Sequence, residues 1–258
     1  MNPTRRTLIG GAAAALLAPR GAAAFGATSA VDIAEIDLGP GTVARLGAWS
    51  RLLREVQQAT SIEVGPAARI RLDDDALFAH PLSVICGDGA FELPSEAALE
   101  RLSRYLTYGG LLLIDDTASD EGGGFDRSAR RLCERIFPTH ALAALPSDHS
   151  LYRSFFLIDR PVGRTARARW LDGVTVGGRE GLGGYTPIVF CHDDLSGALN
   201  RGDDGSQRPC EPGGESQRRE AVKLAVNLVL YCVTTDYKKD QAHVNELLRR
   251  NALRGDWR

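Results

Sequence analysis

Hydrophobic residues along the chain fall into compact runs separated by segments with helical spacing. The compact runs are typical of strands buried on both faces. They cover residues 82–86, 111–114 and 187–191. Residues 31–38 predict an earlier strand, and 62–64 and 70–72 predict two short ones. Weaker strand signals cover residues 151–158 and 174–176.

Helical spacing dominates between these runs. It predicts helices over 46–60, 94–108 and 126–137, a buried helix over 221–233 and a polar C-terminal helix over 240–253. Strands and helices alternate, and such a succession favours parallel strands joined by right-handed crossovers. We therefore expect one open α/β sheet.

The first 27 residues have the composition of an export signal. Arg5 and Arg6 precede a short apolar stretch, and small residues predict cleavage near Ala24 to Ala27. The paired arginines predict transport to the periplasm by the twin-arginine export machinery. An apolar membrane anchor is the alternative, but spanning a bilayer needs about 20 apolar residues. We expect residues 28–258 to form a single mature domain with no membrane span.

Composition narrows the classes of function. The chain has 258 residues, 33 acidic and 31 basic side chains, and a net charge of -2. Because no basic excess is available to neutralise a phosphate backbone, we expect no nucleic-acid partner. Five cysteines are too few for a disulfide scaffold, and their odd number leaves the formation of disulfides open.

Acidic residues follow three of the predicted buried strands. Asp88 follows the first, Asp115 and Asp116 end the second, and Asp193 and Asp194 follow the third. Ligands of open α/β sheets bind outside the carboxyl ends of the strands. We therefore predict an acidic rim that binds a small molecule, such as a polyhydroxylated ligand, or a divalent cation. The competing interpretation is that these acids cap helices and form turns.

Two further side chains are candidates for this rim. Arg127 lies on the helix after the second strand, where it can pair with the acids or bind an anion. His192 precedes Asp193 and supports an alternative function, a hydrolase of envelope carbohydrate or peptide with a rim carboxylate as general base. A cysteine nucleophile is disfavoured, because neither Cys86 nor Cys191 lies in a nucleophile elbow. The sequence contains no metal-binding or dinucleotide-binding motif, so it does not identify a cofactor.

Residues 196–215 contain many Gly, Asp and Arg residues and almost no apolar ones. Such a segment buries too little surface to offset its ordering entropy. We expect a mobile flap beside the rim that closes over a bound ligand.

An ordered set of short motifs carries a resemblance to a known family. The motifs are Gly109–Asp116, Gly124–Arg127 with Arg130, Phe137–Pro138, Leu145–Pro146 with Asp148–His149, and His192–Leu195. Together they resemble the bacterial domain-of-unknown-function family 4159 over about 62–234. The resemblance implies a flavodoxin-like, class I glutamine amidotransferase-like three-layer sandwich with a mostly parallel sheet, and an association with cell-envelope proteins. Enzymes of that fold place a cysteine at a strand-to-helix elbow, whereas this strand continues into Asp115, Asp116 and Thr117.

Overall fold

A computed structural model describes residues 30–177, 184–202 and 204–254; the predicted export signal lies outside them. Seven strands of the described residues form one sheet. They are β1 (Val31–Asp37), β2 (Val64–Arg71), β3 (Leu82–Gly87), β4 (Leu111–Asp116), β5 (Leu142–Ala144), β6 (Asp172–Val176) and β7 (Tyr185–Cys191).

The sheet has the strand order β2-β1-β3-β4-β7-β6-β5. The five strands from β2 to β7 are parallel, whereas β6 and β5 add to the β7 edge in antiparallel pairings. The predicted α/β class with a mostly parallel sheet is therefore confirmed. In register, Cys86 of β3 faces Asp115 of β4, which faces Cys191 of β7.

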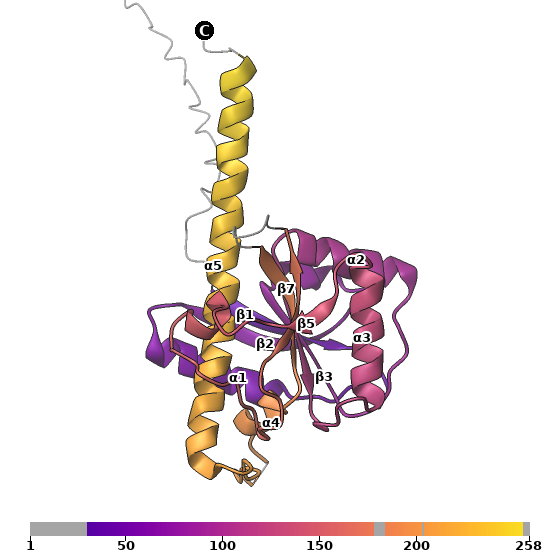
Figure 1. Cartoon of the computed structure of the whole chain (residues 1–258), viewed down its shortest axis with the longest axis vertical. Coiled ribbons are helices and arrows are strands. Elements are labelled where there is room, and N and C mark those ends of the chain that lie inside the picture. Colours follow the sequence, from indigo (N-terminus) through magenta and orange to yellow (C-terminus); the bar gives the residue numbers. More distant parts are fainter. Residues whose placement is uncertain (1–29, 178–183, 203, 255–258) are drawn as a thin grey trace, which may run out of the picture.

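Helices cover both faces of the sheet. The α-helices are α1 (Leu46–Ala59), α2 (Glu96–Thr107), α3 (Gly124–Ile136), α4 (Leu195–Leu199) and α5 (Gly214–Arg254), and the 3-10 helices are η1 (Asp75–Ala79) and η2 (Ser150–Arg153). Helices α1, α4 and α5 lie on one face, α2 and α3 lie on the other, and α5 continues well past the sheet (Figure 1). No helix among the described residues is long and apolar enough to cross a membrane.

The central strands are buried because both faces are covered. All six residues of β3 and of β4 are buried. Successive side chains of a strand point to opposite faces, so Val84 joins the core under α1 and α5 while Ile85 joins the core under α2 and α3. This arrangement explains why these strands are continuous apolar runs in the sequence.

Two predicted strand patterns differ from the structure. Residues 62–64 and 70–72 do not form two strands, because residues 64–71 form the single strand β2 at the edge of the sheet. Pro66 interrupts the pattern but is tolerated on an edge strand. The predicted strand over 151–158 is wrong: it begins in the 3-10 helix η2, and Asn227 of α5 binds the backbone that follows.

The ends of two helices also differ from the prediction. Helix α3 begins at Gly124, two residues before the predicted start, so Asp126 lies within its first turn. The separate helices predicted over 221–233 and 240–253 are one continuous helix, α5, because no breaker residue lies between them. The short strand β5 has no counterpart in the prediction.

The predicted flap over 196–215 is wrong at its start and at its end. All five residues of α4 are buried, and α5 already begins at Gly214. Arg218 of α5 is buried and donates one hydrogen bond to the carbonyl of Ala198 in α4 and one to that of Arg208, which lies between the two helices. A polar segment thus gains order from side chains of α5, which a count of its own apolar residues does not reveal.

Candidate functional site

The carboxyl ends of β4 and β7 bring four of the predicted acids together. Asp115 and Asp116 end β4, and Asp193 and Asp194 follow β7, its parallel neighbour. The backbone N–H of Asp194 donates to the carbonyl of Asp116 at 3.1 Å, so the two strand ends are joined directly. All four residues are buried. We call these four residues the acidic rim.

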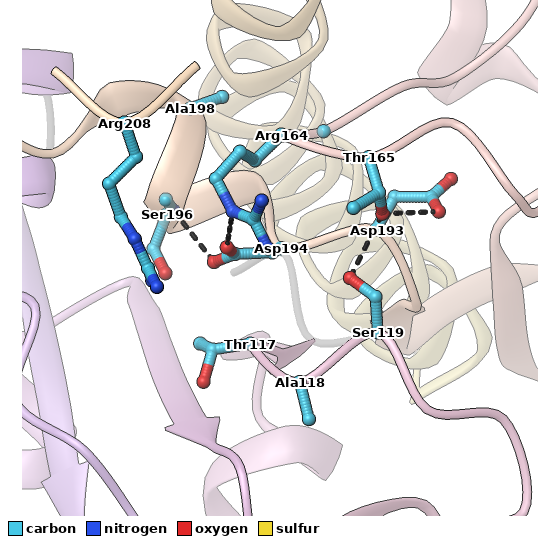
Figure 2. Close-up of polar contacts among 12 residues, drawn as sticks. Thr117, Ala118, Ser119, Arg164, Thr165, Asp193, Asp194, Ser196, Ala198 and Arg208 are labelled. Atoms are coloured by element: carbon cyan, nitrogen blue, oxygen red, sulfur yellow. Dashed lines mark hydrogen bonds and ion pairs between the residues drawn. The ribbon is translucent and has the colours of Figure 1, made fainter. Parts of the chain in front are cut away.

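The second pair of the acidic rim holds the segment 163–168 in place. Asp193 Oδ1 accepts from Thr165 Oγ1 at 3.0 Å and from the backbone N–H of Arg167 at 2.8 Å. Asp194 forms an ion pair with Arg164 and caps α4 by accepting from the N–H of Gly197 at 2.9 Å. Figure 2 shows Asp193 and Asp194 pointing toward Thr165 and Arg164.

Asp115 and Asp116, the first pair of the acidic rim, also accept hydrogen bonds from backbone N–H groups. The two oxygens of Asp115 accept from the N–H groups of Leu195 and Ser196 at 2.7 and 2.8 Å. Asp116 accepts from the N–H groups of residues 118, 119 and 120 at 3.0 to 3.3 Å. The acidic rim therefore organises loops and a helix start, and its carboxylates are not directed into an open pocket.

Burial determines the charge of the first pair. Burial and the nearby charge of Asp194 raise the pKa of Asp115 to about 7, although the two backbone donors favour its ionised form. Burial also raises the pKa of Asp116, and three backbone N–H groups oppose that shift. Asp115 therefore gains or loses its proton near neutral pH.

Asp88 and Arg127 are placed differently. Asp88 is exposed after β3, and its backbone N–H donates to the carbonyl of Gly41 at 3.2 Å. Arg127 is also exposed, and its guanidinium binds the carbonyl of Gly122. Neither side chain belongs to the buried rim.

His192 belongs to a separate charged cluster between α3, β6 and β7. Its Nε2 lies 3.1 Å from Asp172, and its Nδ1 lies 3.7 Å from Asp126. Arg130 bridges the same two carboxylates at 3.0 and 3.2 Å. Burial alone would lower the pKa of His192, but the hydrogen bond with Asp172 and the charges of both carboxylates raise it. Because each ring nitrogen faces a carboxylate of the protein, the geometry gives little support to a general base.

Other titratable groups are also committed to the fold. Desolvation by burial raises the pKa of the Cys86 and Cys191 thiols well above the usual range, as expected for inert core residues. All five cysteines are buried, and none of them forms a disulfide. The His149 loop docks on β7 through Thr186 Oγ1, 3.0 Å from its Nε2. Within the described ranges, no group of three or more His, Cys, Asp or Glu side chains is placed to hold a metal ion.

A groove lies at the same edge of the sheet, beside the ends of β1 and β2. It consists of two adjoining cavities of about 370 and 680 Å³, which share Leu38, Glu92 and Leu93. We call it the strand-end groove. Its remaining lining residues are Asp37, Gly39, Pro40, Arg71, Leu72, Asp73, Ala90, Phe91, Pro94, Ser95, Ala98 and Arg131.

The topology explains this position. The chain leaves β1 toward α1 on one face and leaves β3 toward α2 on the other, which opens a crevice between the two strand ends. Gly41 lets the loop after β1 approach the loop after β3 closely: its φ is +88°, and a Cβ there would collide with the carbonyl of Ala90, a lining residue of the groove.

Sequence reasoning did not identify the strand-end groove. The signal was present, since Asp37 and Asp73 also follow strand patterns at their carboxyl ends, as the rim acids do. The N–H of Gly39 and the guanidinium of Arg69 lower the pKa of Asp37, so this carboxylate is ionised at neutral pH. Glu92 is exposed and lines both cavities.

Comparison with known proteins places the chain in a family. A search of curated proteins finds no match. A family model described as a domain of unknown function, DUF4159, matches residues 32–233. The match starts about 30 residues before the predicted boundary at residue 62 and includes α1 and all of β1 except Val31. The chain therefore belongs to the DUF4159 family.

Proposed function

We propose that this domain is a binding module whose ligand occupies the strand-end groove. One observation carries the proposal: two adjoining cavities of about 370 and 680 Å³ lie where parallel α/β sheets bind their ligands. The acidic rim of β4 and β7 is separate from this groove, since its carboxylates bind segments that do not line either cavity. The ligand contacts are thus assigned to β1, β2 and the loop before α2.

The lining favours a neutral, polyhydroxylated molecule such as a sugar. Glu92 supplies acceptors for hydroxyl groups, and the exposed Arg71–Asp73 ion pair, 3.1 Å between Nε and Oδ1, keeps a further donor nitrogen and acceptor lone pairs. Leu93 and Pro94 offer apolar surface for the C–H faces of a sugar ring. A divalent cation is less well supported, because no described cluster brings three ligating side chains together.

We also infer the finer fold from the strand order. The parallel strands follow the order β2-β1-β3-β4-β7. If the two antiparallel strands are set aside, this is the 2-1-3-4-5 order of flavodoxin-like sheets. The order and the helices on both faces support a flavodoxin-like, glutamine amidotransferase-like three-layer sandwich.

Thermal stability measured with a panel of neutral sugars and with Ca²⁺ and Mg²⁺ salts tests the groove. We expect a sugar that binds to raise the melting temperature as its concentration increases. At one hundred times its Kd, binding should stabilise the folded state by about 2.7 kcal/mol. Glu92→Gln removes a charged acceptor and should weaken sugar affinity about tenfold.

The matched control is Glu63→Gln. Glu63 is exposed and lies just before β2, at the opposite edge of the sheet, so this variant should bind sugar like the original protein. Asp116→Asn should also leave affinity unchanged, because that carboxylate holds a loop. The proposal is abandoned if no sugar shifts the melting temperature, or if Glu92→Gln binds as tightly as the unchanged chain.

The hydrolase alternative has weaker support. It requires His192 or a rim carboxylate to face a substrate, whereas both nitrogens of His192 face Asp126 and Asp172. Hydrolysis of a model glycoside or peptide that is lost in His192→Ala would favour a hydrolase over a binding module.

We further propose that the domain is exported to the periplasm by the twin-arginine machinery and works beside cell-envelope proteins. The support is the Arg5–Arg6 pair before an apolar stretch. Replacing both residues with lysine should leave the precursor in the cytoplasm, as measured by cell fractionation. Arg20→Lys lies in the same segment outside the pair and should be exported normally. Normal export of the doubly substituted chain would contradict this route.

A further inference from the structure

Two of the exposed large hydrophobic side chains lie within three residues of each other. Among the described residues, these exposed side chains are Phe78, Tyr108, Phe155 and Leu157. Leu157 is 82 % exposed and Phe155 is 46 % exposed, and both lie in the segment that follows η2. We call them the Phe155–Leu157 patch.

The patch is held in place by the core. Asn227 Oδ1 of α5 accepts from the backbone N–H of Phe155 at 3.2 Å and of Phe156 at 2.7 Å. On the other side, the N–H of Ile158 donates to the carbonyl of Tyr152 at 2.8 Å, and Ile158 is buried. The exposure of Leu157 therefore belongs to an ordered segment with its backbone anchored on both sides.

Basic and aromatic side chains border the patch. Arg153 and Arg160 flank it in the sequence and are exposed. Arg160 donates to the carbonyl of Ala166 at 2.7 Å, which brings the segment 166–170 alongside. There, the Arg169 guanidinium lies 5.5 Å from the Trp170 ring centroid, and that ring contacts Tyr152. Two exposed arginines thus flank the patch in the sequence and a third lies in the segment that Arg160 contacts, against one exposed acid within 153–160, Asp159.

We propose that the Phe155–Leu157 patch docks on the surface of an anionic phospholipid bilayer. Two side chains offer far less than the roughly 800 Å² per partner that a stable protein interface buries. Shallow insertion into the headgroup region requires no such area, and apolar tips bordered by arginine suit it. The arginines pair with lipid phosphates, while Phe155 and Leu157 enter the acyl boundary. This inference is independent of the ligand in the strand-end groove.

A local fluorescent probe tests the contact directly. All five native cysteines are buried, so Leu157→Cys in the full chain offers one accessible thiol for an environment-sensitive fluorophore. We expect its emission to shift to the blue with vesicles of phosphatidylcholine containing about 30 % phosphatidylglycerol, and much less without the anionic lipid. The same fluorophore at Tyr108→Cys, a site that is 75 % exposed, should not respond.

Affinity measurements complete the test. Phe155→Ser and Leu157→Ser should each weaken binding to anionic vesicles about tenfold, since each removes an inserted apolar side chain. Phe78→Ser is the matched control for Phe155, because both side chains are 46 % exposed, and it should bind like the unchanged chain. Any affinity contributed by the N-terminal apolar stretch is common to every variant.

Three outcomes would overturn the proposal. The first is an unchanged spectrum of the probe at position 157 with anionic vesicles. The second is an equal response with neutral vesicles, which removes the role of the arginines. The third is a dimer in size-exclusion chromatography that Leu157→Ser dissociates, because the patch would then be a contact between copies of this chain.

Discussion

Asp115→Ala is expected to lower the free energy of unfolding by about 2 kcal/mol or more. The substitution removes the two carboxylate oxygens that accept from the N–H groups of Leu195 and Ser196. Both groups are buried, so they lose an acceptor inside the protein. The start of α4 then loses two of its hydrogen bonds to β4, although removing a buried charge offsets part of the loss.

Asp115 should also make stability depend on pH. Its pKa is raised from the model-peptide value of 3.8 to about 7 by burial and by Asp194. An acid whose pKa is higher in the folded state binds its proton more tightly there. Its contribution to the free energy of unfolding is therefore greatest at low pH and is lost as pH rises from about 4 to about 7. His192, whose pKa is also raised, loses its contribution as pH rises through that pKa. The pH dependence that Asp115 contributes is therefore obtained by subtracting the pH dependence of stability in Asp115→Asn from that in the original chain.

Urea unfolding at pH 5 and pH 8 measures the stability lost in Asp115→Ala and the pH dependence that Asp115 contributes. We expect the original chain to lose more stability between these values than Asp115→Asn does. Asp148→Ala is the control, because Asp148 is exposed in a loop, and its change should stay within about 0.5 kcal/mol. An Asp115→Ala protein as stable as the original, or equal pH profiles for the original chain and Asp115→Asn, would contradict this account.

Asn227→Leu is expected to lower the free energy of unfolding by about 3 kcal/mol or more. Asn227 is fully buried in α5 and uses its whole side-chain amide. Its oxygen accepts from the backbone of Phe155 and Phe156, and its nitrogen donates to the carbonyls of Leu151 and Phe156 at 2.9 and 2.8 Å. Leucine leaves these backbone groups without partners while keeping a similar volume.

The readouts are urea unfolding and amide hydrogen exchange. Exchange at Phe155 and Phe156 should accelerate strongly, because their N–H groups lose their acceptor. Asn227→Asp keeps the acceptor but loses both donors, so it should protect these two amides better than leucine does. Arg219→Leu, at an exposed position of the same helix, should change stability by less than about 0.5 kcal/mol. Unchanged exchange at Phe155 in Asn227→Leu would show that the amide does not hold this segment.

The sequence by itself determined the class of the fold and most of its central elements. Residues 82–86, 111–114 and 187–191 are continuous apolar runs because both faces of β3, β4 and β7 are covered. Ser95 caps α2 with a local hydrogen bond to the N–H of Ala98, three residues away. Such signals depend on near neighbours in the chain, so periodicity and capping rules can detect them.

The tertiary structure alone decided where the polar side chains point. Asp115 meets its partners 80 and 81 residues further along the chain, and Asn227 meets its partners 71 to 76 residues earlier. No local pattern encodes such separations. The sequence therefore placed four acids at neighbouring strand ends, but only the packing of α4 and the segment 163–168 turned them inward. The strand-end groove is decided at the same level, because β1, β2 and the start of α2 come together only when the sheet is complete.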